Sequence, residues 1–307
     1  MSQNVTLWPK FRRRSISKGN SIALDKTFAT WSLRAGAGKA VKSDTMSFST
    51  NIRIPAILEW RRDIRLGPLE ESEVRVVRID LGTGKECDDE ARDLTRLPQW
   101  KVLSEAEQGR GLRFVRHRDR RRFVVCRGTV RMVLGQLLGI PADDVVFRSG
   151  SGGKPELDPV EHGRGPKSGK SLPRFNVTHS GDFALLALCR DRELGVDLEH
   201  RRTIAESSRI VASYFTPAEC SQFLGLSESI RDVAFLRGWT RKEAILKARG
   251  VGLAGLATSF ETMFGTAELG RNFTPTTPLH QVQGWSLWEA APCEEYVAAL
   301  AVQSSPT

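Results

Sequence analysis

From about residue 57 onwards, apolar and polar positions along the chain follow strand and helix periods. Residues 73–80 (EVRVVRID) alternate between the two classes, which is typical of a half-buried strand. Ser104 and Glu107 form an S-x-x-E capping box, which predicts the start of a helix. A longer helical pattern covers residues 123–139 and ends at Gly139. The pattern therefore predicts a strand followed by helices in the first part of the chain.

The second part of the chain repeats this order of signals. Thr216 and Glu219 form another capping box, and an apolar helical pattern follows it. The interval from Glu107 to Arg127 equals the interval from Glu219 to Trp239. We therefore predict an α+β fold with two similar α/β halves, which are related by a pseudo-twofold axis and meet at a cleft where a ligand could bind.

Residues 1–56 differ in composition from the rest and are predicted to be a separate leader. Residues 1–58 hold ten Lys or Arg against two acids, and they are rich in Ser and Thr. This composition is typical of a mitochondrial or chloroplast transit peptide and equally of a disordered basic tail. We expect the folded halves at residues 57–175 and 176–302. The expected location is intracellular, either cytoplasmic or, if the leader is a transit peptide, in one of those organelles.

The overall composition fits a folded protein of the cell interior. Of 307 residues, 40% are hydrophobic and 27% are charged. The longest apolar run, residues 183–189, is too short to span a bilayer. Five scattered cysteines form no CxxC pair and indicate a reducing compartment without a zinc site. Any bound metal should therefore be a hard ion held by oxygen ligands.

Carboxylates and a lysine stand at two places where the surrounding sequence is apolar. In residues 194–200 (LGVDLEH), Asp197 and Glu199 share one face of a predicted strand, as in a half-exposed strand whose acidic face lies in water, and the rest of the chain must decide whether they do more. Glu243 and Lys247 are i and i+4 on a mostly apolar helix. This spacing would occur in an exposed ion pair and equally on a buried helix that carries both charges toward a cleft. Both interpretations stay open.

A third stretch combines a hydroxyl, an imidazole and a flexible glycine. Thr178, His179 and Ser180 precede Gly181 and a strongly apolar run. Such donors before a strand suit the binding of an anion, although a single histidine is often structural. The net charge of +10 also suggests an anionic partner, but most of the excess lies in the leader.

Taken together, these segments resemble the 4′-phosphopantetheinyl transferases. The resemblance rests on FNVTHS at residues 175–180, GVDLE at 195–199 and WTRKEAILK at 239–247, with SGSGGKP at 149–155. It covers residues 57–302. The resemblance implies transfer of the phosphopantetheine arm of coenzyme A to a serine of an apo acyl or peptidyl carrier protein, with Mg²⁺ as cofactor and adenosine 3′,5′-bisphosphate as the second product.

The resemblance also implies roles for individual residues. The metal ligands would be Asp197, Glu199 and Glu243, with Glu243 also the base for the carrier serine and Lys247 neutralising phosphate charge. The positions that match coenzyme A-binding residues of the family are Arg118, Arg148, Lys154, Pro155, Asn176, Thr178, His179 and Lys247. Thr178 stands where the family usually has serine, which keeps the hydroxyl.

Two other functions remain as alternatives. A basic protein with clustered carboxylates could be a nucleic-acid-binding protein or a metal-dependent nuclease, although no zinc finger or RNP motif is present. A coenzyme A-binding protein without catalysis would be expected to lack Asp197, Glu243 or Lys247, and the chain has all three. We therefore expect a monomeric transferase that uses neither nucleic acid nor a membrane.

Overall fold

The computed structural model describes most of the chain after residue 56. The described residues are 57–59, 65–82, 93–162, 172–251, 257–262, 264–265, 269–271, 274–275, 282 and 284–304. All of them belong to one compact unit that spans Thr50–Thr307. The leader predicted over residues 1–56 lies outside the described residues. No helix in the described ranges is long and apolar enough to cross a membrane.

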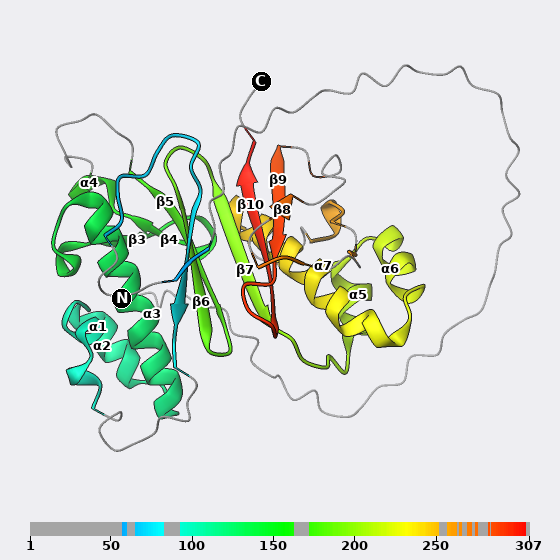
Figure 1. Cartoon of the computed structure of the whole chain (residues 1–307), viewed down its shortest axis with the longest axis horizontal. Helices are drawn as coiled ribbons and strands as arrows, with labels where there is room; N and C mark the ends of the chain where they lie inside the picture. The colour runs from blue at the N-terminus through cyan, green and yellow to red at the C-terminus, as the bar shows by residue number, and fades with distance from the viewer. Residues whose placement is uncertain are drawn as a thin grey trace, which may run out of the picture. The chain divides into compact units, whose positions relative to one another are not determined.

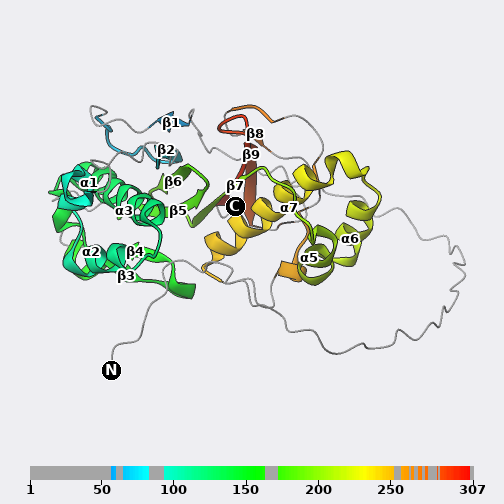
Figure 2. The same cartoon turned by 90° about the horizontal axis from the view of Figure 1, so that it is seen from below.

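The first sheet has four strands in the order β1-β2-β6-β5, and all four are labelled in the second of two views (Figures 1 and 2). Its strands are β1 (Leu58–Glu59), β2 (Arg75–Asp80), β5 (Arg174–Ser180) and β6 (Phe183–Cys189). β6 pairs antiparallel with both β2 and β5. A two-stranded antiparallel sheet, β3 (Phe147–Ser149) and β4 (Pro155–Leu157), stands apart from it in the hydrogen-bond pattern.

The second sheet has four strands in the order β7-β10-β9-β8. Its strands are β7 (Leu194–His200), β8 (Thr274–Pro275), β9 (Trp285–Ala290) and β10 (Tyr296–Gln303). β10 lies between β7 and β9 and is antiparallel to both. β7 is therefore a terminal strand of this sheet, with one edge paired to β10.

Seven α-helices accompany these sheets in the described part of the chain (Figures 1 and 2). They are α1 (Pro98–Lys101), α2 (Glu105–Leu112), α3 (His117–Leu138), α4 (Pro159–His162), α5 (Ser207–Tyr214), α6 (Pro217–Leu224) and α7 (Glu228–Arg249). Within the same described ranges, four short 3₁₀ helices cover Leu94–Arg96, Ala142–Asp144, Ser151–Gly153 and Ala257–Ser259. The two long helices, α3 and α7, have 22 residues each. Both end at a glycine in the left-handed conformation.

The two halves repeat one order of elements. A first strand (β2 or β7) is followed by helices and then by a hairpin whose second strand pairs with that first strand. The predicted α+β fold with two similar halves is confirmed by this repeat. The boundary predicted between residues 175 and 176 needs correction, because it cuts β5. The β5–β6 hairpin turns at Gly181 and completes the first sheet, so the halves divide between Cys189 and Leu194.

Apolar side chains from both sheets form one shared core. Val76 and Leu185 of the first sheet belong to the same buried cluster as Val196 and Leu300 of the second. Burial of side chains of this size contributes roughly 1.5–3 kcal/mol each. The two halves are therefore joined by a continuous apolar core rather than by a flexible linker.

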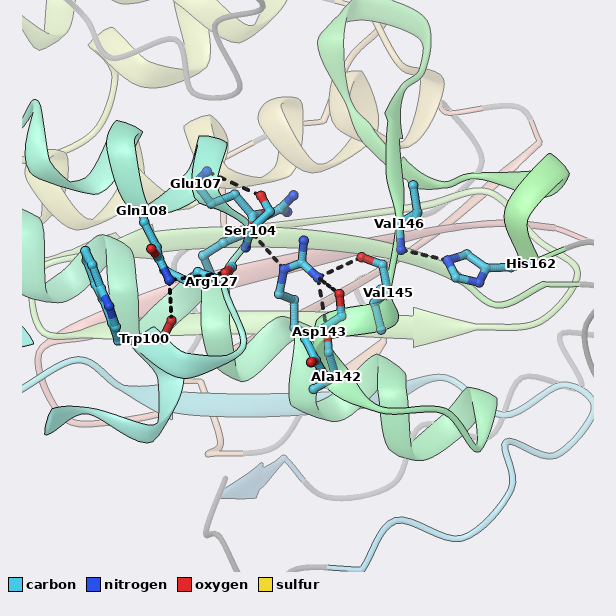
Figure 3. A network of polar contacts seen from close by, with 12 residues as sticks. Trp100, Ser104, Glu107, Gln108, Arg127, Ala142, Asp143, Val145, Val146 and His162 are labelled. Atoms are coloured by element: carbon cyan, nitrogen blue, oxygen red, sulfur yellow. Dashed lines mark hydrogen bonds and ion pairs between the residues drawn. The ribbon is translucent and has the colours of Figure 1, made fainter. Parts of the chain in front are cut away.

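The first capping box is confirmed, and its glutamate also ties α2 to α3. The Ser104 hydroxyl accepts from the backbone N–H of Glu107, whose carboxylate accepts from the backbone N–H of Ser104. Glu107 also forms ion pairs with Arg127 and Arg131, the latter at 2.7 Å (Figure 3). Arg131 in turn donates to the Val145 carbonyl at 2.8 Å. This network fixes the helices of the first half against each other.

The second capping box is confirmed as well, and its glutamate ties α6 to α7. Glu219 pairs with Lys242 of α7 at 2.8 Å. Arg131 and Lys242 each lie eight residues before the glycine that ends their helix, at Gly139 and Gly250. The matching partners of the two glutamates are therefore Arg131 and Lys242.

A buried carboxylate in the second sheet predicts part of the acid sensitivity of the fold. Burial raises the pKa of Glu289, but hydrogen bonds and charge from Arg237 and Arg241 outweigh it and hold this pKa below its ordinary value. A lowered folded pKa gives stability that is present above the unfolded pKa of about 4.5 and is lost as the pH falls through the folded pKa. We expect the free energy of unfolding to fall between about pH 5 and pH 3, by up to about 1.4 kcal/mol per pH unit for this one proton.

The corresponding measurement is urea unfolding of the wild type and Glu289→Gln across that pH range. At neutral pH the variant should have a lower free energy of unfolding than the wild type, because both arginines lose their charged partner. This free energy should then fall less steeply as the pH is lowered. Equal slopes for the two proteins would contradict this assignment of the proton.

Candidate active site

The described structure brings four of the predicted catalytic and metal-binding residues together between β7 and α7. Asp197 and Glu199 alternate with the core residues Val196 and Leu198 along β7, so both acids point to one face of the strand. Glu243 and Lys247 lie one turn apart on α7. The pKa of Asp197 is shifted by the charges of Lys247, Glu243 and Glu199. These residues form a single charged cluster, which we call the β7–α7 cluster.

Asp197 is the most buried member of this cluster, at 5% exposure. Its Oδ1 atom accepts from the Lys247 ammonium at 2.5 Å and from the Thr178 hydroxyl at 3.2 Å. The Thr178 hydroxyl oxygen lies 3.3 Å from the same ammonium. The Oδ2 atom of Asp197 is buried and has no hydrogen-bond partner in the described structure. A buried carboxylate oxygen without a partner is unfavourable, which marks this atom as the point where a ligand would be accepted.

The pKa values in the β7–α7 cluster reflect crowded negative charge. Burial raises the pKa of Asp197 to about 7, with Lys247 acting against this shift and Glu243 and Glu199 adding to it. Burial likewise raises the pKa of Glu243, against the effect of Lys247 and with that of Glu199. Burial lowers the pKa of Lys247, but Asp197 and Glu243 outweigh it and raise that pKa overall. The cluster therefore holds more negative charge than its own lysine neutralises.

Glu199 has two partners that the sequence did not suggest. Its Oε2 atom accepts from the Ser180 hydroxyl at 3.2 Å and from Arg202 at 2.8 Å. The Arg202 side chain is 51% exposed, so this ion pair contributes ~0–1 kcal/mol and opens easily. Ser180 lay inside the recognised FNVTHS stretch, but Arg202 stands in an irregular segment after β7, where no sequence pattern predicts its direction.

Several residues predicted to bind coenzyme A are already engaged in contacts within the chain. The Lys154 ammonium donates to the Leu194 carbonyl at 2.9 Å and lies 3.3 Å from Glu193, at the start of β7. Asn176 is buried and its Oδ1 atom accepts from the backbone N–H of Val196 at 2.9 Å. Both side chains therefore connect the first half to β7.

The remaining predicted binding residues lie at other places in the first half. Arg118 is exposed in the first turn of α3, and Arg148 is exposed on β3, where it pairs with Glu156 at 3.1 Å. Pro155 begins β4 and is opposite Ser149 in its register. In addition, His179 is half-buried on β5, next to Thr178. Among the described residues, no hydrogen bond or ion pair joins Arg118 or Arg148 to the β7–α7 cluster.

The cluster does not yet have the geometry of an assembled metal site. Within the described ranges, no three His, Cys, Asp or Glu side chains stand close enough together to hold a metal ion. Lys247 donates to the Oδ1 atom of Asp197, and Arg202 donates to the Oε2 atom of Glu199, so both oxygens already have a cationic partner. The donor set nevertheless fits a hard cation, because it consists of carboxylates, carries excess negative charge and leaves the Asp197 Oδ2 atom without a partner.

Comparisons with known proteins identify the family of this chain. A model of the 4′-phosphopantetheinyl transferase superfamily matches residues 193–301, and a model of the N-terminal part of 4′-phosphopantetheinyl transferases matches residues 95–190. The chain is 36% identical over 203 residues to the 4′-phosphopantetheinyl transferase HetI of Nostoc sp., a match that covers 66% of the chain and 78% of HetI. The chain belongs to the 4′-phosphopantetheinyl transferase superfamily.

More distant members of the superfamily give the same assignment. An L-aminoadipate-semialdehyde dehydrogenase-phosphopantetheinyl transferase of Xenopus laevis is 29% identical over 221 residues, which is 69% of the chain and 70% of that protein. The 4′-phosphopantetheinyl transferase psf-1 of Bacillus pumilus is 26% identical over 192 residues, or 59% of the chain and 74% of psf-1. The two family models meet between residues 190 and 193, where β6 gives way to β7. The boundary between the two models thus coincides with the change from the first sheet to the second.

Proposed function

We propose that this protein transfers the 4′-phosphopantetheine arm of coenzyme A to a serine of an apo acyl or peptidyl carrier protein. The observation that carries the proposal is the β7–α7 cluster, which combines three carboxylates, a lysine and the buried, unpartnered Asp197 Oδ2 atom in a chain of this superfamily. Such a surplus of acceptors suits a metal-assisted reaction at a pyrophosphate.

Mg²⁺ is the cation that fits this donor set best. We propose that Asp197, Glu199 and Glu243 hold it, since Mg²⁺ prefers carboxylates together with substrate phosphate and water. When bound, the ion would supply charge stabilisation at the pyrophosphate oxygens of coenzyme A. Arg202 would leave Glu199 at little cost, because their ion pair is half-exposed.

The protein's own side chains supply the remaining steps of the proposed reaction. Glu243 takes the proton from the carrier serine, whose oxygen then attacks the phosphorus that carries the pantetheine arm. The pyrophosphate P–O bond breaks, and adenosine 3′,5′-bisphosphate leaves with the bonding electrons. Lys247 neutralises charge on the phosphate oxygens. The Lys247 ammonium donates to the Oδ1 atom of Asp197, which keeps it in position. Its pKa is raised, so it is positively charged at neutral pH.

The contacts suggest different roles for the predicted coenzyme A-binding residues. Arg118, Arg148 and His179 reach the surface of the first half wholly or in part and are proposed to contact the nucleotide part of coenzyme A. Lys154 anchors the β3–β4 segment beside β7, because its ammonium already contacts Leu194 and Glu193, and Pro155 follows it at the start of β4. Thr178 lies within reach of both Asp197 and Lys247, beside the proposed phosphate position.

The decisive experiment incubates the purified protein with coenzyme A, Mg²⁺ and a panel of apo carrier proteins from fatty acid, polyketide and peptide synthesis. We expect at least one carrier to gain the mass of phosphopantetheine, and Glu243→Gln to reduce the rate at least about a hundredfold. The measurement is intact-carrier mass spectrometry.

The same experiment separates the transferase from a coenzyme A-binding protein without catalysis. A wild type that binds coenzyme A but modifies no carrier would favour the second function, whereas a Glu243→Gln variant as active as the wild type would contradict the proposed site. Because one chain carries both halves, we also propose a monomer, which size-exclusion chromatography with light scattering would test. The location of the protein stays a prediction from the leader.

A further inference from the structure

The backbone of β7 touches α7 directly at Gly195. A Cβ atom built on Gly195 would lie 2.1 Å from the Ala244 carbonyl oxygen and 2.4 Å from the Ala248 backbone nitrogen. No side chain can occupy this space, so the strand and the helix are in backbone contact there. Ala244 and Ala248 directly follow Glu243 and Lys247 on α7, and Gly195 lies on the same face of β7 as Asp197. Gly195 therefore sets the distance between the two elements that carry the β7–α7 cluster.

The free edge of β7 is held by side chains of β5. β7 is the terminal strand of its sheet, and the Val196 N–H points away from β10 to the Oδ1 atom of Asn176 at 2.9 Å. Both groups are buried, so this hydrogen bond satisfies a backbone donor that water does not reach. Asn176 thus takes the place that a neighbouring strand's carbonyl would have.

Two more β5 residues continue this connection along the strand. Thr178 donates to the Asp197 Oδ1 atom, and Ser180 both donates to Glu199 and accepts from the backbone N–H of His200 at 3.0 Å. Asn176, Thr178 and Ser180 alternate along β5 and so share one face. They form a side-chain ladder between β5 and β7, which we call the β5–β7 ladder.

We propose that the β5–β7 ladder and Gly195 position the carboxylates of Asp197 and Glu199. Gly195 fixes β7 from the side of α7, and Asn176 fixes the next residue from the side of β5. Thr178 then orients Asp197 through Oδ1, which leaves Oδ2 as the oxygen without a partner. Asn176 is thus a positioning residue and not a coenzyme A ligand. This inference rests on the proposed function and adds what holds its metal-binding carboxylates in place.

The test uses Asn176→Ala and Gly195→Ala, each with a matched control in the first half. Gln108→Ala also removes a partly buried side-chain bond to the backbone, since Gln108 donates to the Trp100 carbonyl at 3.2 Å. Gly128→Ala creates a comparable clash, because a Cβ there would lie 2.4 Å from the Gln99 carbonyl oxygen. Both controls should cost stability without touching β7.

Two readouts separate positioning from a merely structural role. We expect Asn176→Ala and Gly195→Ala to weaken Mn²⁺ binding, measured by electron paramagnetic resonance without coenzyme A, by roughly 10- to 100-fold. We expect kcat for carrier modification to fall by a similar factor while KM for coenzyme A stays within about twofold. The controls should match the wild type in both readouts at a temperature where all variants are folded, as checked by circular dichroism.

Each outcome has a distinct meaning. If Asn176→Ala matches Gln108→Ala in Mn²⁺ affinity and kcat, or if only its KM for coenzyme A rises, the positioning proposal is overturned. If Gly195→Ala does not fold, Asn176→Ala decides alone. If the wild type binds Mn²⁺ but modifies no carrier, the proposed function is wrong. The Mn²⁺ affinities of the variants and their controls would still decide the positioning role. A wild type that binds no Mn²⁺ overturns the positioning proposal as well.

Discussion

Asp197→Asn is expected to lower the rate of carrier modification by about a thousandfold and to leave the fold nearly as stable as the wild type. The carboxylate is buried, its Oδ2 atom has no partner, and burial raises its pKa to about 7. Its charge is thus poorly accommodated by the folded protein alone. Replacing it with an amide of the same shape removes that charge, so we expect the free energy of unfolding to change by less than about 1 kcal/mol. Activity should depend on the charge, and stability should not.

Glu107→Gln provides the matched control for this prediction. Glu107 is a carboxylate of similar burial, at 12% side-chain exposure against 7% for Asp197, but it has two arginine partners and caps α2. Its replacement leaves Arg127 and Arg131 without a counter-charge and should cost roughly 3–5 kcal/mol. The control should therefore lose stability and keep activity per folded molecule, which is the opposite of Asp197→Asn. Urea unfolding and carrier mass spectrometry measure the two quantities, and a stable, fully active Asp197→Asn would exclude this residue from the reaction.

The sequence predicted most reliably those features that depend on neighbouring residues. Both capping boxes form as expected, because Ser104 with Glu107 and Thr216 with Glu219 are three residues apart and need no tertiary context. The apolar pattern predicts a helix that starts at Phe123, whereas α3 begins at His117. Its first turns are mostly arginine and have no apolar period to show them.

Features that depend on distant residues were predicted in part or not at all. The charged face of β7 could be expected from the alternation around Asp197, and the i, i+4 spacing placed Glu243 and Lys247 on one face of a helix. The sequence could not show that Asn176 bonds to Val196, because that contact depends on β5 of one sheet lying next to β7 of the other. A motif names the residues of a site, but their partners follow only from the way the halves pack.

Lys242→Met is expected to lower the free energy of unfolding by roughly 3–5 kcal/mol, as much as Glu107→Gln. Lys242 and Glu219 are both 1% exposed at their side chains and form an ion pair at 2.8 Å. The lysine also donates to the Phe260 carbonyl at 2.8 Å and lies over the rings of Phe215 and Phe260. Methionine would fill the same space, but the charge of Glu219 would stay buried without a cation.

Combining Lys242→Met with Glu219→Gln should restore most of this loss. In the wild type, the backbone N–H of Thr262 donates to the Glu219 carboxylate at 2.7 Å, and the side-chain oxygen of glutamine can still accept this hydrogen bond. The glutamine also removes the unpaired charge. A double variant within about 1 kcal/mol of the wild type would show that the buried pair is coupled. Lys101→Met, at an exposed position on α1, is the control and should change stability by less than about 0.5 kcal/mol.

The double variant also tests how independent the faces of α7 are. Lys242 precedes Glu243 in the sequence, yet it points into the core with Glu219 while Glu243 belongs to the β7–α7 cluster. If the pair only anchors the helix, the restored double variant should also recover carrier modification, because Gly195 and Lys247 still hold α7 against β7. Restored stability without activity would instead mean that the buried pair sets the exact orientation of Glu243, which places Lys242 among the positioning residues of the site.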